Sequence, residues 1–123
     1  VGDVSFISLK KLLPKISELK IPELVLLIKP QFECGIAIAK KYKGIIRDKK
    51  VHFNVINDII ISFVECNYYC INLTFSPITG GDGNIEYLAH FKLNANKEIL
   101  PTKQVLQNVE KIVDEAFNTL LLH

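Results

Sequence analysis

The sequence predicts one α/β domain, in which helices cover both faces of a mostly parallel sheet. Three observations lead to this expectation. Segments of strand character alternate with segments of helical periodicity, one strand is a continuous apolar run, and glycine-rich turn chemistry joins the last two strands. The 123 residues suffice for a single hydrophobic core. The terminal hairpin is expected to give the sheet one antiparallel edge strand.

The N-terminal third begins with strand character and continues into a helix. Residues 1–9 are apolar and β-branched, which is typical of a strand. Ser8 is a suitable N-cap for a helix over about residues 9–20, with lysines on one face. Pro14 is expected to distort this helix or to shift its start. The opposite, apolar face comprises Leu9, Leu12, Leu13, Ile16 and Leu19.

The middle of the chain contains a strand followed by two helical stretches. Residues 23–29 form the continuous apolar run, which suits a strand covered on both faces. A less regular helical stretch over about 33–43 is expected to end near Gly44. A connector then leads to a helix over about 51–66. Its apolar residues recur at steps of four: Val51, Val55, Ile59 and Phe63.

The C-terminal third predicts a hairpin and a long helix. Residues 68–78 read as a strand, and the three glycines of 79–84 indicate a turn. Residues 85–94 are the expected antiparallel partner strand. Thr102 is expected to cap the final helix. The apolar face of that helix comprises Val105, Val109, Ile112, Ala116 and Leu120.

Composition limits the classes of protein and site. The apolar content of 49% and the small net charge of +2 argue against disorder. The net charge does not by itself indicate a nucleic-acid binder, but the lysines clustered within 10–20 and 40–50 allow a local basic patch. Three cysteines without paired spacing fit neither a disulfide framework nor a zinc site, which favours a reducing cytoplasm. No run of eighteen apolar residues predicts a membrane span. His52 and His90 lack metal-ligand spacing, so we interpret them as structural and expect no metal.

Four ordered sequence blocks point to a family. They are DVSFISL (3–9), LIKPQFE (27–33), GIIRDKKVH (44–52) and SPITGGDGNIEYL (76–88). Together they resemble the haemolysin-A-like branch of the FtsJ-type methyltransferases, the TlyA family. The similarity runs from residue 3 to about residue 90, and the final helix is compatible with it.

This resemblance implies a fold, an activity and a set of site residues. It implies a Rossmann-like fold and an S-adenosylmethionine-dependent ribose 2′-O-methyltransferase that acts on ribosomal RNA. FtsJ-type enzymes carry a Lys-Asp-Lys-Glu tetrad. Asp3 matches its aspartate, Lys29 its second lysine and Glu86 its glutamate. The resemblance makes Lys29 the base or hydroxyl-orienting group, held by the two carboxylates.

The departures from the family pattern concern what precedes residue 1. In the family, the glycine-rich cofactor loop, the first lysine and an S4-type RNA-binding domain all come before the aspartate. The sequence contains none of them, and the glycine turn at 79–84 lies between two strands, which is not a phosphate-binding context. Residues 1–123 are therefore expected to be the C-terminal part of the catalytic domain and to be inactive alone.

Each candidate also has a plain structural interpretation. Lys29 can extend its ammonium from a strand end into water, Asp3 can be a turn residue, and Glu86 can be an exposed strand residue. Ser5 and Arg47 are candidates for RNA contact, although Arg47 can equally pair with its neighbour Asp48 or cap a helix.

Three hypotheses follow from the sequence. The first is the methyltransferase part, with ribosomal RNA or a ribosomal subunit as partner. The second is a membrane-active haemolysin, which lacks support from any spanning or strongly basic amphipathic segment. The third is an inert α/β fragment that self-associates through surface its missing strands would cover. No stable membrane association is expected.

Overall fold

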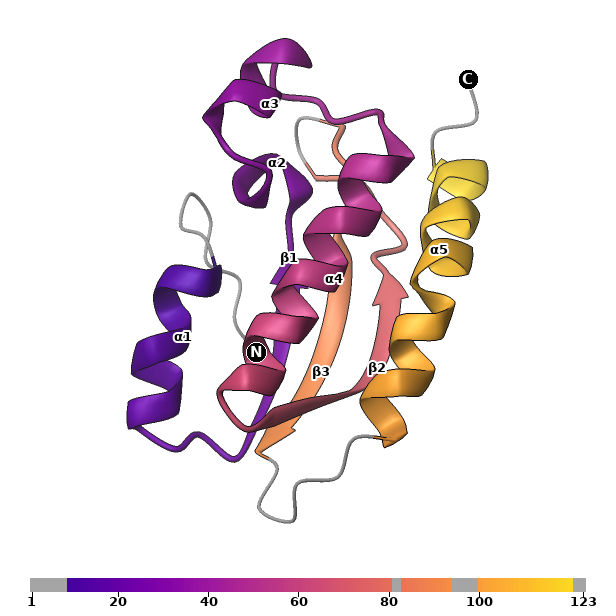
Figure 1. Cartoon of the computed structure of the whole chain (residues 1–123). Helices are drawn as coiled ribbons and strands as arrows, with labels where there is room; N and C mark the ends of the chain where they lie inside the picture. Colours follow the sequence, from indigo (N-terminus) through magenta and orange to yellow (C-terminus); the bar gives the residue numbers. More distant parts are fainter. Residues whose placement is uncertain (1–8, 81–82, 94–99, 121–123) are drawn as a thin grey trace.

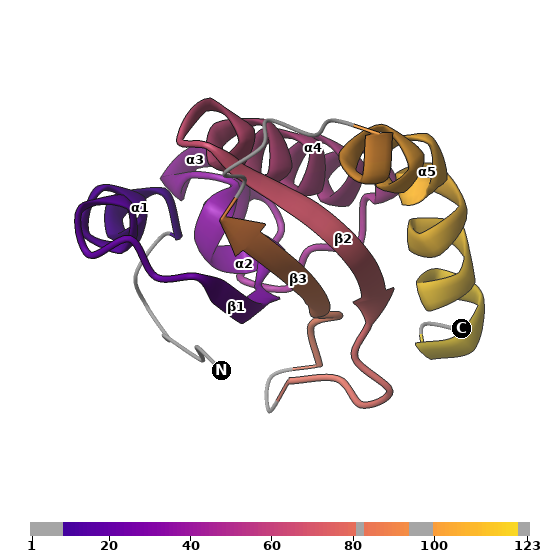
Figure 2. The ribbon, with the colours of Figure 1, turned by 90° about the horizontal axis from the view of Figure 1, so that it is seen from below.

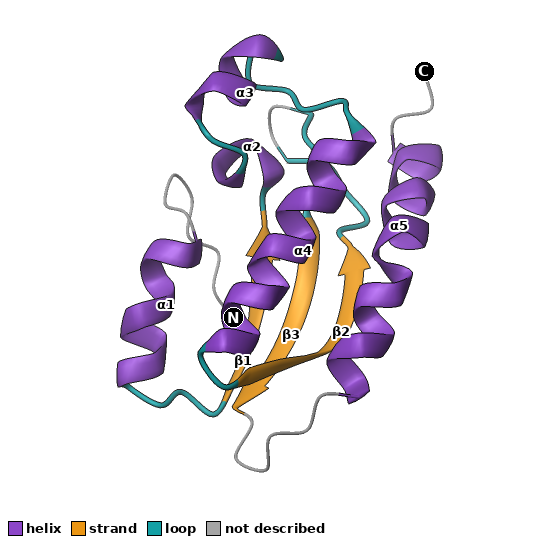
Figure 3. Cartoon of the chain, viewed as in Figure 1, coloured by secondary structure: helices purple, strands orange, loops and turns teal. Residues whose placement is uncertain are grey.

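The computed structural model describes residues 9–80, 83–93 and 100–120 (Figure 1). The strand expected over residues 1–9 and the Ser8 cap thus lie outside the described residues, apart from Leu9. Helices and strands otherwise alternate much as the sequence predicts (Figure 3). In chain order the elements are α1 (Leu9–Glu18), β1 (Glu23–Ile28), α2 (Pro30–Glu33), α3 (Ile36–Lys41), α4 (Lys49–Glu65), β2 (Tyr68–Phe75), β3 (Tyr87–Leu93) and α5 (Leu100–Leu120).

The described sheet has three strands in the order β1-β3-β2, and both pairings are antiparallel. β1 and β2 therefore run in the same direction, on either side of β3. The expected mostly parallel sheet is not seen among the described residues, where both pairings are antiparallel. The expectation of an antiparallel edge strand was also wrong, because β3 lies in the middle. The turn fixes β3 beside β2, but which strand covers its other side depends on contacts between residues more than 60 positions apart, such as Leu24 with Phe91.

The described helices cover one face of the sheet, not two. Figure 2 shows α4 and α5 above the strands, with α1 beside them. The expectation of helices on both faces was therefore wrong for the described residues. One cluster joins α1, α4, α5 and alternate strand residues, because a half-covered strand buries every second side chain. Its fully buried members include Ile28, Ile56, Ile59, Ile60, Phe63, Tyr87, Ala89, Phe91 and Val109.

Helix α1 begins at Leu9 and contains Pro14 without ending there. Leu9, Leu13 and Ile16 are buried, as predicted. Leu19 is 59% exposed, because the helix ends at Glu18 and Lys20 adopts a left-handed φ of 51°.

The less regular helical stretch expected over about 33–43 contains α3, and a second short helix, α2, comes just before it. Pro30 starts α2, where its fixed φ suits the first turn. Gly35, with φ at 91°, separates α2 from α3. Gly44, with φ at 83°, follows α3, close to where the sequence predicted the end.

The long helices begin slightly earlier than predicted. Asp48 caps α4, and its Oδ1 accepts from the backbone N–H of Lys50 at 2.9 Å. Thr102 does not cap α5, because the helix already begins at Leu100. Instead, the Thr102 Oγ1 accepts from the backbone N–H of Cys70 at 2.9 Å, beside the register shift of β2 between Cys70 and Asn72.

Candidate active site at the end of strand β1

Lys29 and Glu86 lie at the same edge of the sheet. Ile28, the last residue of β1, pairs with Tyr87, the first residue of β3. Lys29 follows Ile28 and Glu86 precedes Tyr87, so the continued register places the two facing each other. Each is only 9% exposed. Burial this deep is uncommon for lysine and glutamate, and it argues against the interpretation of Lys29 or Glu86 as ordinary solvated residues.

The backbone at Lys29 is fixed by strand β1 on its N-terminal side and by helix α2 on its C-terminal side. Lys29 is the N-cap residue of α2, and its carbonyl accepts from the N–H of Phe32 at 2.9 Å. Its Nζ lies 5.9 Å from the centre of the Phe32 ring, within the range of a cation–π contact. The lysine side chain therefore starts from a fixed backbone and stays near the sheet edge.

Gln31 is a third buried polar residue at this edge, and sequence reasoning missed it. Its side chain is 8% exposed, and its Nε2 donates to Glu86 Oε2 at 3.4 Å. Its Oε1 is buried and is the only such side-chain atom without a hydrogen-bond partner among the described residues. Leaving a buried polar atom unpaired costs about 1–3 kcal/mol. A glutamine two positions after the strand-end lysine was the available signal.

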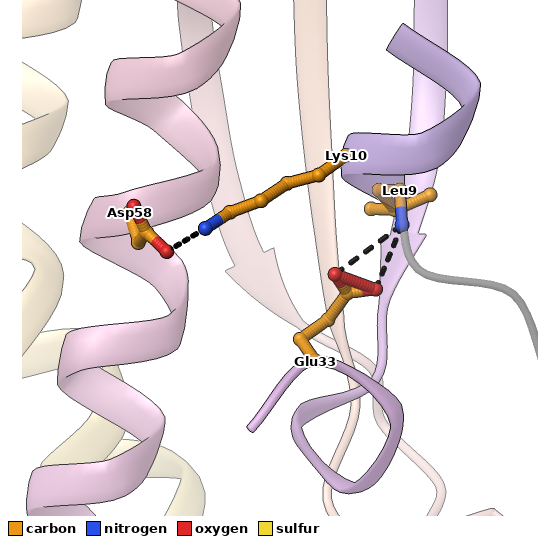
Figure 4. A network of polar contacts seen from close by, with 4 residues as sticks. All are labelled: Leu9, Lys10, Glu33 and Asp58. Atoms are coloured by element: carbon orange, nitrogen blue, oxygen red, sulfur yellow. Dashed lines mark hydrogen bonds and ion pairs between the residues drawn. The ribbon is translucent and has the colours of Figure 1, made fainter. Parts of the chain in front are cut away.

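Glu33 links helix α1 to the same region, and it too was missed. Its carboxylate accepts from the Leu9 N–H, at 2.8 Å and 3.2 Å for its two oxygens (Figure 4). A carboxylate suits this position because the first N–H groups of a helix have no partner within the helix. Lys10 adds an ion pair to Asp58 on α4. The chain at Leu9 is therefore fixed beside α2.

A fully bonded polar network supports the loops behind the site. Asn84 is 1% exposed; its Oδ1 accepts from Ile46 N–H at 2.9 Å and its Nδ2 donates to the Gly44 carbonyl at 2.8 Å. His52 Nε2 lies 2.9 Å from the Ile46 carbonyl, and its Nδ1 lies 2.7 Å from the Tyr87 hydroxyl. The network fixes residues 44–46 against the loop that carries Glu86.

Burial sets the protonation of this network. It lowers the pKa of His52 to about 4, so the ring is neutral near pH 7. A neutral ring donates through one nitrogen only, and the carbonyl of Ile46 requires that nitrogen to be Nε2. The Tyr87 hydroxyl therefore donates to Nδ1, and burial raises the pKa of that hydroxyl. Both ring nitrogens of His52 therefore have partners within the fold, in agreement with its structural interpretation.

The remaining predicted site residues have varied positions. Asp3 and Ser5 lie outside the described residues. Arg47 is exposed and makes no hydrogen bond or ion pair with a described residue. Its neighbour Asp48 instead caps α4 and accepts from the Tyr42 hydroxyl at 2.9 Å, which lowers the pKa of the carboxyl. His90 pairs with Glu23.

Exposed cations gather between α3 and the first turn of α4. Six basic residues occur within eleven positions, and all are exposed. Asp48 is the only acidic residue among them, and its carboxylate is already used as a cap. In Figure 1, α3 and the start of α4 lie toward the same end of the sheet as α2. These residues, the basic segment, are Lys40, Lys41, Lys43, Arg47, Lys49 and Lys50.

Other site types find little support in the described part of the chain. A groove of about 330 Å³ between α4 and α5 is lined by Lys49, Phe53 and Asp114, among others, but Lys49 already pairs with Asp114 at 3.1 Å. The described residues contain no group of three His, Cys, Asp or Glu that could hold a metal. None of their helices is long and apolar enough to cross a membrane.

Comparison with known proteins identifies the family. The sequence profile of FtsJ-like methyltransferases matches residues 1–93, about three quarters of the chain. The chain belongs to the FtsJ-like methyltransferase family. The match covers Asp3, Lys29 and Glu86, as well as Gln31 and Glu33.

Three curated relatives place the chain near the TlyA branch of this family. The protein of Bacillus subtilis (strain 168) named "Putative rRNA methyltransferase YqxC" is 43% identical, across 96% of this chain and 42% of its own length. Hemolysin A of Brachyspira hyodysenteriae is 48% identical, across 74% of this chain and 38% of its own length. The 23S rRNA (cytidine-2′-O)-methyltransferase TlyA of Campylobacter jejuni is 38% identical, across 75% of this chain and 36% of its own length.

Solved structures agree with the described fold. The structure named "Putative hemolysin from Streptococcus thermophilus" superposes with a TM-score of 0.83 at 34% identity, and covers 95% of this chain and 41% of that one. A similarly named structure from Lactococcus lactis gives 0.79 at 40% identity, covering 92% and 52%. The chain thus spans about half or less of the length of the relatives it matches.

Proposed function

We propose that this chain is part of an S-adenosylmethionine-dependent enzyme that methylates a ribose 2′-hydroxyl of ribosomal RNA. The observation that carries the proposal is the buried pair of Lys29 and Glu86 at the sheet edge of an FtsJ-like domain. The names of the Bacillus and Campylobacter relatives support the RNA substrate. The complete domain is proposed to be Rossmann-like, with further parallel strands beside β1.

Lys29 is the proposed base or orienting group for the hydroxyl. A hydroxyl becomes a good nucleophile only as its proton is removed, and a lysine accepts a proton only in its neutral form. A carboxylate beside the lysine fixes the position of its side chain. Glu86 supplies one such carboxylate, and Asp3 is proposed to supply the other. The anchoring of Leu9 at α2 supports this, because Asp3 lies only six positions earlier in the chain.

The cofactor would supply the methyl group when bound. The residues at the β1 edge fit the acceptor side of such a reaction, since they are buried and polar and one of them, Gln31, has a side-chain oxygen without a partner among the described residues. The described part of the chain offers no glycine loop at a helix N-terminus to cradle the nucleotide, and the family places that loop before Asp3. We therefore propose that residues 1–123 alone have no activity. We also propose that the complete protein is cytoplasmic.

The basic segment is the proposed contact for the RNA backbone. Its cations are exposed and lie on α3, the first turn of α4 and the segment between them, toward the same end of the sheet as α2. Phosphate contacts of this kind fix position without reading sequence. Arg47 is the central candidate, because its guanidinium has no partner among the described residues and can bind a phosphate in bidentate fashion. Ser5 is a second proposed RNA contact.

The test is methyl transfer by the complete gene product, with cofactor binding followed by calorimetry. Lys29→Ala should reduce transfer about 100-fold or more while cofactor affinity stays within about threefold. Lys111→Ala, at an exposed position of α5, is the matched control and should leave both unchanged.

Two results would contradict the proposal. If the unaltered protein neither binds S-adenosylmethionine nor methylates ribosomal RNA, the assignment fails. The haemolysin names of the Brachyspira and streptococcal relatives then make cofactor-independent lysis the activity to measure. Self-association of residues 1–123 alone, followed by sedimentation, tests the third hypothesis separately.

A further inference from the structure

The side-chain amide of Gln31 lies inside the candidate site, and only its NH₂ group has a hydrogen-bond partner among the described residues. Its Nε2 lies 3.4 Å from Glu86 Oε2, and its Oε1 is buried without a partner among the described residues. Gln31 and Glu86 are 8% and 9% exposed. The orientation of the amide follows from chemistry, because a carboxylate accepts hydrogen bonds and so must face the NH₂ group.

A purely structural role does not account for this arrangement. An apolar side chain of the same size would fill the space and leave no polar atom unpaired. Asn84 and Thr102, which are buried as deeply or deeper, use their side-chain oxygens in hydrogen bonds to the backbone. Gln31 differs from them in presenting a buried acceptor, and it does so next to the residues matched to the family tetrad.

We propose that Gln31 positions the Glu86 carboxylate through Nε2, and that its Oε1 accepts a hydrogen bond from a ribose hydroxyl of the bound ligand. This inference rests on the proposed function. Either the acceptor nucleotide of the RNA or the ribose of the cofactor can supply such a hydroxyl. In both cases the ligand would satisfy the one buried side-chain atom that the described residues leave unpaired.

Loss of the Nε2 donor and loss of the Oε1 acceptor are expected to change different kinetic constants. The contact to Glu86 holds one wall of the site, so its loss should lower kcat. The acceptor oxygen contacts the ligand, so its loss should weaken ligand binding. Gln31→Met keeps the length and shape of the side chain but removes both the donor and the acceptor. Gln31→Glu keeps an acceptor oxygen and removes the donor.

The experiment measures kcat, the KM for ribosomal RNA and the Kd for S-adenosylmethionine in the complete gene product. Gln31→Met should lower kcat/KM for RNA at least tenfold, while the melting temperature stays the same or rises. Gln31→Glu should lower kcat with ligand affinity within about threefold of the unaltered protein. Gln107→Met, at an exposed position of α5, is the matched control and should change nothing.

The ligand constants identify the source of the hydroxyl. A weaker Kd for S-adenosylmethionine in Gln31→Met assigns it to the cofactor, and a higher KM for RNA with an unchanged Kd assigns it to the RNA. If kcat falls while both constants stay unchanged, the acceptor half of the proposal is overturned.

The remaining outcomes separate this inference from the proposed function. If the unaltered protein methylates RNA and Gln31→Met does so within twofold, the inference fails and the proposed function stands. If Gln31→Met loses activity only in proportion to a lowered melting temperature, Gln31 is structural and the inference is overturned. If the unaltered protein has no methyltransferase activity, the proposed function itself fails.

Discussion

Two buried polar clusters flank the first residues of β3, and they differ in how completely they are hydrogen-bonded. On one side, Asn84 and His52 bond to backbone groups of residues 44–46 and to Tyr87. On the other, Gln31 reaches Glu86 and leaves its oxygen unpaired. A buried polar network in which every atom is hydrogen-bonded stabilises one structure. A network that leaves a buried acceptor unpaired at a sheet edge can still form a hydrogen bond to a ligand. Substitutions in the two clusters should therefore separate loss of stability from loss of activity.

The largest expected effect is on activity, from Glu86→Gln. The variant keeps the shape of the side chain and an oxygen for Gln31 Nε2 but removes the charge beside Lys29. Methyl transfer by the complete gene product should fall about 100-fold, which corresponds to about 2.7 kcal/mol in the barrier. Its unfolding temperature should stay within about 2 °C. Glu115→Gln, at an exposed position of α5, is the control. An unchanged rate would remove Glu86 from the site.

Asn84→Ala should show the opposite pattern, a loss of stability. It leaves the Ile46 N–H and the Gly44 carbonyl without their partner, at a cost of about 2–5 kcal/mol in the free energy of unfolding. Urea denaturation measures this change. Asn84→Asp keeps the acceptor for Ile46 but turns a buried carboxylate oxygen toward the Gly44 carbonyl, so it should also be destabilising. Equal stability of all three proteins would show that the network is not a structural support.

The pH dependence of stability should report His52. Its folded-state pKa is lowered from about 6.5 to about 4, so the unfolded chain binds the proton more readily. Stability contributed by the neutral ring is present above pH 6.5 and is lost as the pH falls toward 4. Linkage gives a loss of about 2–4 kcal/mol across this window.

Denaturation at pH 7 and at pH 4.5 measures the contribution of His52. His52→Gln should remove much of the difference between the two pH values, whereas His90→Gln, at a half-exposed position of β3, should leave most of it. The interpretation would be overturned if His52→Gln had the same pH dependence as the unaltered protein.

The smallest expected effect comes from Glu33, which joins α1 to the region of the site. Glu33→Ala removes the acceptor of the Leu9 N–H and should cost about 1 kcal/mol of stability. Glu33→Gln retains an acceptor and should cost less. Faster amide hydrogen exchange in the first turn of α1 would be the direct measurement. Unchanged exchange there would contradict the capping role.

The candidate site was partly predictable. The resemblance to the family blocks singled out Lys29 and Glu86, and the apolar run and the glycine turn placed them at strand ends, because these features are local in sequence. Gln31 offered only its place two residues after Lys29, since its importance lies in a contact across 55 positions and in an oxygen without a partner among the described residues. Thr102 gave a misleading signal, because threonine is a common N-cap residue. In the structure its hydroxyl oxygen instead accepts a hydrogen bond from Cys70 of β2.

The sequence alone determined most helices and strands, their order and the family blocks, because periodicity and turn chemistry act between near neighbours. The tertiary structure decided that β3 lies between β1 and β2, that the described helices share one face, and that residues 30–41 break into two helices around Gly35. It also decided which buried polar atoms are paired. These outcomes depend on packing between distant segments, where the free energy of contacts outweighs local preference.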